Sequence, residues 1–179
     1  MNFTCHVKKK YLELVFTASQ KLGISMAYIQ KATVINGSRE RVFSKHATLS
    51  GIRQCLTNIL DIEVIGQPIE TLFKGQQIEL YLGFKGISRR CILKVEDLVP
   101  NQKIDFRQVK GLFRSFRVLT QFEDHGESGC VITDLADYRL PLGLLGHLVD
   151  DLFLKGEIEK VITRRQVTLA KVFSGEMGN

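Results

Sequence analysis

Residues 77–84 read Gln-Ile-Glu-Leu-Tyr-Leu-Gly-Phe, with an apolar side chain at every second position. In an extended chain this spacing places Ile78, Leu80, Leu82 and Phe84 on one face and leaves the other face more polar. A strand with one covered face and one wetted face is typical of an antiparallel sheet. The segment therefore predicts such a sheet, and similar segments occur on both sides of it.

Further strand patterns, rich in β-branched or alternating apolar residues, are separated by turn residues such as Asn36-Gly37 and Gly66. These segments are residues 27–35, 63–65, 87–98, 103–109, 114–123 and 129–138. Two short helices are expected after the first strand. One starts at an N-cap Ser38 and runs through Lys45, and the other covers residues 52–59 after a break at Ser50-Gly51.

A long helix is expected over residues 144–173, because apolar residues recur there at helical spacing. This order of elements predicts the α+β class, with a curved antiparallel sheet wrapped around one long C-terminal helix and two short helices after the first strand. A single helix does not fill the concave side of so wide a sheet. We therefore expect a cavity between the helix and the sheet.

The chain has 179 residues, of which 44% are hydrophobic and 25% charged, a composition typical of one globular domain. We place that domain at residues 26–174, after an N-terminal extension (1–25) and before a polar tail (175–179). The extension begins with Lys8-Lys9-Lys10 and a short apolar stretch that contains Glu13. A signal peptide, an amphipathic helix on the domain or on a membrane surface, and a natural start at Met26 all remain open.

The net charge of +6 is concentrated in the first 59 residues, which hold nine Lys/Arg and two Asp/Glu, against sixteen and seventeen in the rest. Binding to nucleic acid or to an anionic membrane is therefore expected, if anywhere, from that part. One later hairpin carries basic residues with aromatic residues between them: Arg107, Lys110, Arg114, Arg117, Phe113 and Phe116. The alternation turns these aromatic rings toward the core, so no nucleic-acid partner is expected.

The four cysteines and four histidines are scattered and lack the close ligand spacing of a zinc site, so neither a metal nor a cofactor is expected. Reduced thiols indicate a cytoplasmic protein. No apolar run approaches the 18 residues that a membrane-spanning helix needs.

Asp134 and Tyr138 are the weak candidates for catalysis. By alternation both point to the same side as Ile132, and a carboxylate in an apolar pocket would have a raised pKa and could act as a general acid or base. The alternative is structural: Asp134 would hydrogen-bond a strand end or the start of the last helix.

Two segments carry a family resemblance, Gly111-Leu-Phe-Arg-Ser-Phe-Arg-Val-Leu-Thr-Gln-Phe122 and Thr133-Asp-Leu-Ala-Asp-Tyr-Arg-Leu-Pro-Leu-Gly-Leu-Leu-Gly146. They resemble the G-P-F-x-x-W-x-H-x-H-x-F hairpin and the T-D-x-x-x-Y-x-L-P-L-G motif of the START-like helix-grip superfamily (SRPBCC), which includes polyketide cyclases and lipid-transfer domains. The two segments also resemble a bacterial subgroup loosely labelled cell-division inhibitors. The resemblance implies the helix-grip fold and a ligand-binding domain.

This sequence departs from the family pattern at several positions. Leu112 stands for the family's Pro, Phe116 for its Trp, and Val118 and Thr120 for its two inward histidines. The pocket should therefore be less polar than in those relatives, and acid–base catalysis loses two of its groups.

We accordingly expect a non-catalytic protein that binds or transports a hydrophobic small molecule or lipid. The alternatives are an enzyme of the cyclase or dehydratase type that uses Asp134 and Tyr138, and a regulatory module that binds a partner in cell division. Transient contact with a membrane surface would accompany lipid binding, and the ligand and the oligomeric state stay open. The expected lining is Leu80, Leu82, Cys91, Leu93, Val95, Phe106, Phe116, Val118, Thr120, Ile132, Asp134, Tyr138, Leu145, Val149 and Leu152.

Overall fold

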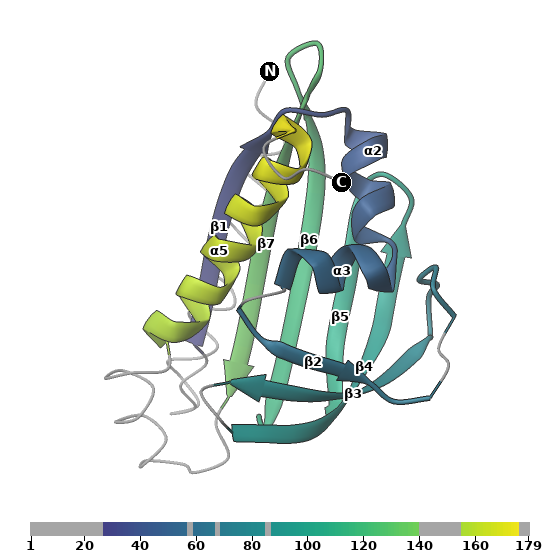
Figure 1. Ribbon diagram of the computed structural model, residues 1–179, viewed down its shortest axis with the longest axis vertical. Helices are drawn as coiled ribbons and strands as arrows, with labels where there is room; N and C mark the ends of the chain where they lie inside the picture. The colour runs from purple at the N-terminus through teal and green to yellow at the C-terminus, as the bar shows by residue number, and fades with distance from the viewer. Residues whose placement is uncertain (1–26, 57–58, 67–68, 85–86, 140–154, 176–179) are drawn as a thin grey trace, which may run out of the picture.

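A computed structural model of the chain describes residues 27–56, 59–66, 69–84, 87–139 and 155–175 (Figure 1). Within these ranges the strands are β1 (Ala27–Ile35), β2 (Asp61–Val64), β3 (Gln77–Phe84), β4 (Ile87–Val99), β5 (Lys103–Lys110), β6 (Ser115–His125) and β7 (Gly129–Arg139). The helices are α2 (Arg39–His46), α3 (Leu49–Leu56) and α5 (Lys155–Ser174).

The strands form one antiparallel sheet in the order β1-β7-β6-β5-β4-β3-β2. From β2 to β7, strands that follow one another in the chain pair with one another in the sheet. The exception is β1, which forms one edge of the sheet and pairs with β7, the last strand. The sheet curves so strongly that β2 and β3 run across the direction of β6 and β7 (Figure 1). The expected architecture, a curved antiparallel sheet with a long C-terminal helix and two short helices after the first strand, is confirmed.

The alternation of side chains along the strands is also confirmed. In β7 the residues expected to face inward are almost fully buried: Cys130, Ile132, Asp134, Ala136 and Tyr138. Inward residues of β3 to β6 join a large core cluster together with Val42 and Phe43 of α2 and Leu169 of α5. A smaller cluster holds Ile29, Ala136, Tyr138 and Ile162.

The start of α3 corrects one sequence-based expectation. The helix was expected to begin at residue 52, after a break at Ser50-Gly51, but it begins at Leu49 and contains Gly51. Thr48 caps it, because the Gly51 amide donates to Thr48 Oγ1 (3.1 Å). A Cβ at position 51 would lie 1.8 Å from the carbonyl oxygen of Lys45. Glycine is therefore required there by the close approach of α2 to α3.

Helix α5 lies over the concave side of the sheet, against β1 and α3 (Figure 1). The expected helix started at residue 144, and its part before Lys155 lies outside the described residues. The same holds for the N-terminal extension before residue 27. None of the described helices has the length and apolarity to cross a lipid bilayer.

Candidate functional site

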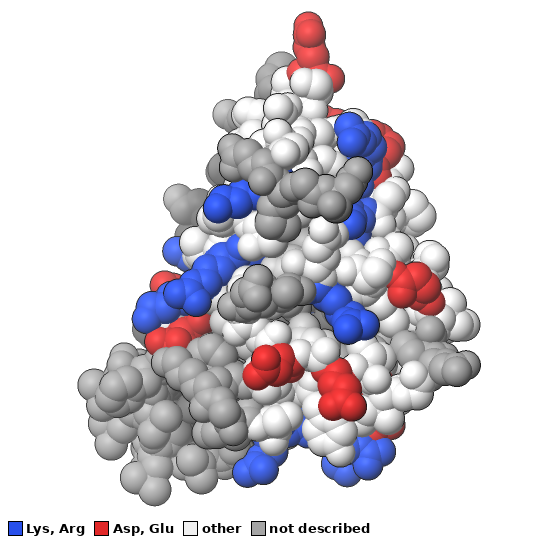
Figure 2. All heavy atoms as spheres, in the orientation of Figure 1, with Lys and Arg blue, Asp and Glu red and all other residues white. Residues whose placement is uncertain are grey.

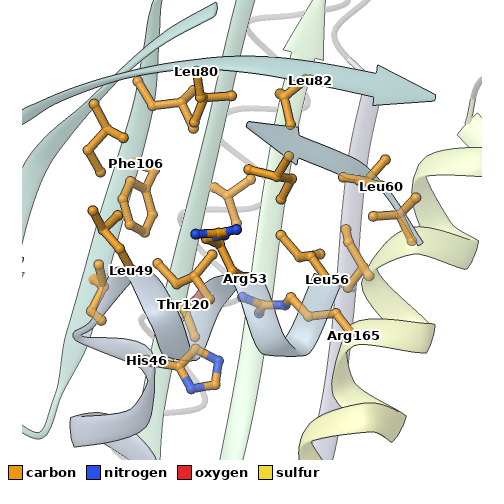
Figure 3. Close-up of a pocket in the computed structure, with 18 of the residues that line it drawn as sticks. His46, Leu49, Arg53, Leu56, Leu60, Leu80, Leu82, Phe106, Thr120 and Arg165 are labelled. Carbon is orange, nitrogen blue, oxygen red and sulfur yellow. The ribbon is translucent and has the colours of Figure 1, made fainter. Parts of the chain in front are cut away.

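A partly enclosed cavity of about 200 Å³ lies between the concave face of the sheet, α3 and the first half of α5 (Figure 3). Strands β2 to β7 supply its floor, and α3 and α5 supply the opposite wall. Nearly all of the wall is apolar. The polar or charged residues that reach it are His46, Arg53, Thr120, Asp134 and Arg165.

Eight of the residues expected to line a cavity lie on this wall: Leu80, Leu82, Leu93, Phe106, Phe116, Val118, Thr120 and Asp134. They come from five strands, so the curvature of the sheet brings together positions that are more than fifty residues apart. Val118 and Thr120, which replace the histidines of related sequences, are both on the wall.

Four other expected lining residues do not reach the cavity: Cys91, Val95, Ile132 and Tyr138. All four face inward and are at most 1% exposed, but they pack inside the core clusters. Alternation predicts the face on which a side chain lies, whereas the position of the cavity along each strand depends on the packing of the helices. Leu145, Val149 and Leu152 lie outside the described residues.

Sequence reasoning missed part of the wall on both sides of the cavity. The missed residues are Leu60, Ile62, Val64, Ile78 and Ile104 on the side of the sheet, His46, Leu49, Ile52, Arg53 and Leu56 from α2 and α3, and Ile158, Val161, Ile162 and Arg165 from α5. One signal was present in the sequence. Arg165 falls three residues after Ile162, within the apolar stripe of the last helix. A cation on a buried face needs an anion opposite it, and Asp134 was the carboxylate expected to point inward.

Asp134 is the centre of a buried polar network that joins the sheet to α5. Its Oδ1 accepts a hydrogen bond from Thr120 Oγ1 (2.8 Å), the cross-strand neighbour on β6, and is ion-paired with Arg165 Nη2. Its Oδ2 accepts from Gln166 Nε2 (2.8 Å). Asp134 therefore bonds to two consecutive side chains in the middle of α5, and not to the start of the last helix or a strand end.

Gln166 extends this network to the edge of the sheet. Its Nε2 also donates to the carbonyl oxygen of Lys31 (3.1 Å), and its Oε1 accepts from Thr33 Oγ1 (2.7 Å). Gln166 is 3% exposed, so its hydrogen bonds are sheltered from water. The network fixes both the position and the rotation of α5 over β1 and β7.

The protonation state of Asp134 differs from the one expected from the sequence. Burial alone would raise its pKa, but the charge of Arg165 and the hydrogen bonds from Arg165 and Thr120 outweigh burial and lower the pKa below its ordinary value. Asp134 is therefore ionised at neutral pH. The raised pKa expected for a general acid is wrong, because the sequence did not reveal the cation opposite it.

His46, at the end of α2, lies at the same end of the cavity as Thr120 (Figure 3). Its Nδ1 lies 3.2 Å from the carbonyl oxygen of Val42 and donates to it in the tautomer that this contact selects. The ring packs edge-on against Phe122, with centroids 5.2 Å apart. Burial, reinforced by the charge of Arg165, lowers the pKa of His46 to about 4, so the ring is neutral at pH 7.

The aromatic residues of the basic hairpin pack inward, as expected. Phe113 stacks on Phe116 (5.0 Å) and meets the ring of Tyr138 edge-on (5.6 Å). On the other face of the sheet, Arg117 forms a two-pronged ion pair with Asp105. The hairpin therefore uses its rings and Arg117 for packing and pairing within the protein.

No group of three His, Cys, Asp or Glu residues that could hold a metal ion is found in the described part of the chain. Cys55, Cys91 and Cys130 are buried free thiols, and burial raises the pKa of each.

Neutralising Asp134 should destabilise the protein. In Asp134→Asn the Arg165 charge stays buried without its anion, and we expect the free energy of unfolding to fall by about 3 kcal/mol. Asp137→Asn is the matched control on the same strand. Burial already raises the pKa of Asp137, so removing its charge should change the free energy of unfolding by less than about 1 kcal/mol. Urea denaturation of both variants measures this, and equal losses would refute a special role for Asp134.

Stability should fall on mild acidification. Between pH 6.5 and about 4 an unfolded chain protonates His46 while the folded protein, where Arg165 and Asp134 face the ring, does not. The folded state should therefore lose on the order of 3 kcal/mol as the pH falls through this window. Urea titrations at half-unit pH steps test this. In His46→Gln this loss of stability should be much smaller. If the dependence of the unfolding free energy on pH is unchanged in that variant, the loss does not come from His46.

Known proteins share the family profile and the fold of this chain. The sequence profile described as polyketide cyclase / dehydrase and lipid transport matches residues 30–156. A search of curated protein sequences gave no match.

Solved structures with a similar fold come from distant organisms. A protein of Chromobacterium violaceum is 12% identical, with a TM-score of 0.64 over 82% of this chain and 96% of its own. A START superfamily protein of Mycobacterium smegmatis is 14% identical, with a TM-score of 0.64 over 84% and 99%. The ginseng major latex-like protein 151 of Panax ginseng is 10% identical, with a TM-score of 0.63 over 83% and 97%.

At these identities the solved structures show the fold, which is the START-like helix-grip fold expected from the two sequence motifs. The family profile spans most of the chain, from the middle of β1 to the beginning of α5. The protein therefore belongs to the polyketide cyclase/dehydrase and lipid transport family.

Proposed function

We propose that the protein binds a hydrophobic small molecule or lipid in the cavity between the sheet and α5, and that it does so without catalysis. The observation that carries this proposal is the wall itself, where leucine, isoleucine, valine and phenylalanine side chains from five strands and two helices surround one space. Protein interiors are normally close-packed, and an unfilled apolar space loses contact energy. An apolar ligand would restore those contacts.

The packing of the helices accounts for the space. Leu169 of α5 is packed in the core cluster at one end of the helix, whereas Ile158, Val161 and Ile162 line the cavity at the other end. Helix α3 lies beside α5 and covers another part of the wall with Leu49, Ile52 and Leu56. The cavity is therefore bounded by elements that the core and the Asp134 network already hold in place.

Catalysis by Asp134 and Tyr138 is the alternative, since the family description includes cyclases and dehydrases. Both Asp134 oxygens already accept hydrogen bonds, and the lowered pKa makes this carboxylate a poor acid. Tyr138 packs beside Phe113, away from the cavity. These observations favour binding over proton transfer. No described feature favours the cell-division module over ligand binding.

Partners and location follow from the same proposal. A lipid would be exchanged during transient contact with a membrane surface, and no nucleic-acid partner is proposed. The buried free thiols Cys55, Cys91 and Cys130 support a cytoplasmic location.

Filling the cavity should weaken ligand binding. Leu93 points into the cavity, while its neighbour Ile92 points to the other face of the sheet, so Leu93→Trp and Ile92→Trp are a matched pair. With the uncharged fluorescent probe N-phenyl-1-naphthylamine, we expect Leu93→Trp to weaken binding at least about tenfold, or about 1.4 kcal/mol. Ile92→Trp should bind the probe with an affinity within about twofold of that of the unchanged protein, since a substitution on the other face of the sheet acts independently of the cavity. Equal affinities in the two variants would rule out this cavity as the binding site.

A further inference from the structure

His46 brings a hydrogen-bond acceptor to the cavity wall. The residue is 5% exposed and lines the cavity. Its Nδ1 lies 3.2 Å from the carbonyl oxygen of Val42, which cannot donate, so the single ring proton of the neutral histidine is on Nδ1. The other ring nitrogen, Nε2, therefore carries a lone pair and no hydrogen. The hydrogen bond that the structure gives to this ring is the one at Nδ1.

The orientation of the His46 ring is fixed by its neighbours. The ring is held by the carbonyl group of Val42 on one side and packs edge-on against Phe122, with centroids 5.2 Å apart. Phe122 is itself packed edge-on against Phe43 of α2 (5.4 Å). A turn of the ring would break these contacts together. Nε2 is therefore a preorganised acceptor, which binds a partner with little loss of conformational entropy.

Thr120 and Arg165 are the other polar groups at this end of the cavity. Figure 3 shows them, with His46, at the end opposite Leu80 and Leu82. The hydroxyl hydrogen of Thr120 is donated to Asp134 Oδ1 (2.8 Å), so its oxygen can act toward the cavity as an acceptor. The guanidinium of Arg165 carries further N–H groups besides the one that pairs with Asp134. Acceptors and donors are therefore present together.

The local charges favour a neutral group at this end. Asp134 repels an anion and Arg165 repels a cation, while each already neutralises the other. His46 is neutral at pH 7, because burial and the charge of Arg165 lower its pKa to about 4. Charged side chains of both signs lie on the outer surface of this face (Figure 2). An ionic group of a ligand is therefore better served outside, by water and by those surface charges.

From this arrangement we infer that the ligand carries a hydroxyl group, which donates its hydrogen to Nε2 of His46 while the apolar body of the ligand fills the rest of the cavity. The inference rests on the proposed function and names the class of ligand, a neutral and largely apolar alcohol or phenol. A hydroxyl group suits this place because its oxygen can also accept from Arg165. An analogue without the hydroxyl leaves Nε2 without a partner, and sites built to bond a hydroxyl reject such analogues.

Two ligands of the same shape test this on the full chain. 2-Naphthol has a hydroxyl group where 2-methylnaphthalene has a methyl group, and each displaces N-phenyl-1-naphthylamine from the cavity. Burial of the methyl group by itself favours 2-methylnaphthalene. We nevertheless expect the unchanged protein to bind 2-naphthol at least about threefold more tightly. In His46→Leu the ratio of the two affinities should fall at least about tenfold. His46→Gln, whose amide oxygen can accept, should retain part of the preference.

His125→Leu is the matched control, because His125 is an exposed histidine at the end of β6 and does not line the cavity. It should leave the ratio of affinities unchanged. Damage to the structure weakens the binding of both ligands and therefore cancels from this ratio. A measurement on the unchanged protein needs no substitution: in 15N NMR the Nε2 resonance of His46 should shift on addition of 2-naphthol and stay in place with 2-methylnaphthalene.

Two results would overturn the inference and leave the proposed function standing. One is the same ratio of affinities in the unchanged protein and in His46→Leu, and the other is an Nε2 resonance that responds equally to both ligands. An equal fall of the ratio in His125→Leu would overturn the inference too, since the effect would not depend on the cavity. Failure of the protein to bind N-phenyl-1-naphthylamine and both naphthalenes would overturn the inference and the proposed function together.

Discussion

The buried ion pair between Asp134 on β7 and Arg165 on α5 is the interaction on which the rest of the structure depends. Removing two charges from water is costly, and the cost is offset here only because Thr120 and Gln166 satisfy the remaining oxygen positions of the carboxylate. A shift of α5 along the sheet, or a rotation about its own axis, would break these bonds together. The pair therefore fixes where the helix lies.

That fixed position determines the shape of the cavity. Gln166 and Leu169 hold the second half of α5 against β1 and β7. Ile158 and Val161 in the first half line the cavity. The strands opposite curve away, and α3 closes part of the gap. Away from the Asp134 network, His46 and Arg53, the described wall is formed by apolar side chains. Such a wall favours a ligand with a large apolar part.

Local patterns were enough to predict most of the fold. Two-residue alternation predicted β3 to β7, while β-branched residues and turn residues predicted β1 and the approximate place of β2. Ser38 is confirmed as the cap of α2, where its Oγ accepts from the Arg41 amide. Features that depend on contacts between distant elements were missed. From the sequence alone Gly51 indicates a helix break, because the Lys45 carbonyl that leaves no room for a Cβ there belongs to α2. The cation facing Asp134 lies 31 residues further along the chain. Cys91 and Tyr138 face inward as expected, yet only the helix packing shows that they lie away from the cavity.

The central claim is that the cavity holds an apolar ligand, and intact mass is the most direct test of it. The protein would be purified without detergent and its mass measured under native and denaturing conditions. We expect a native mass larger by that of one small molecule, which is absent from Leu93→Trp prepared in the same way. Identical native and denatured masses, in a protein that also fails to take up N-phenyl-1-naphthylamine, would contradict the account.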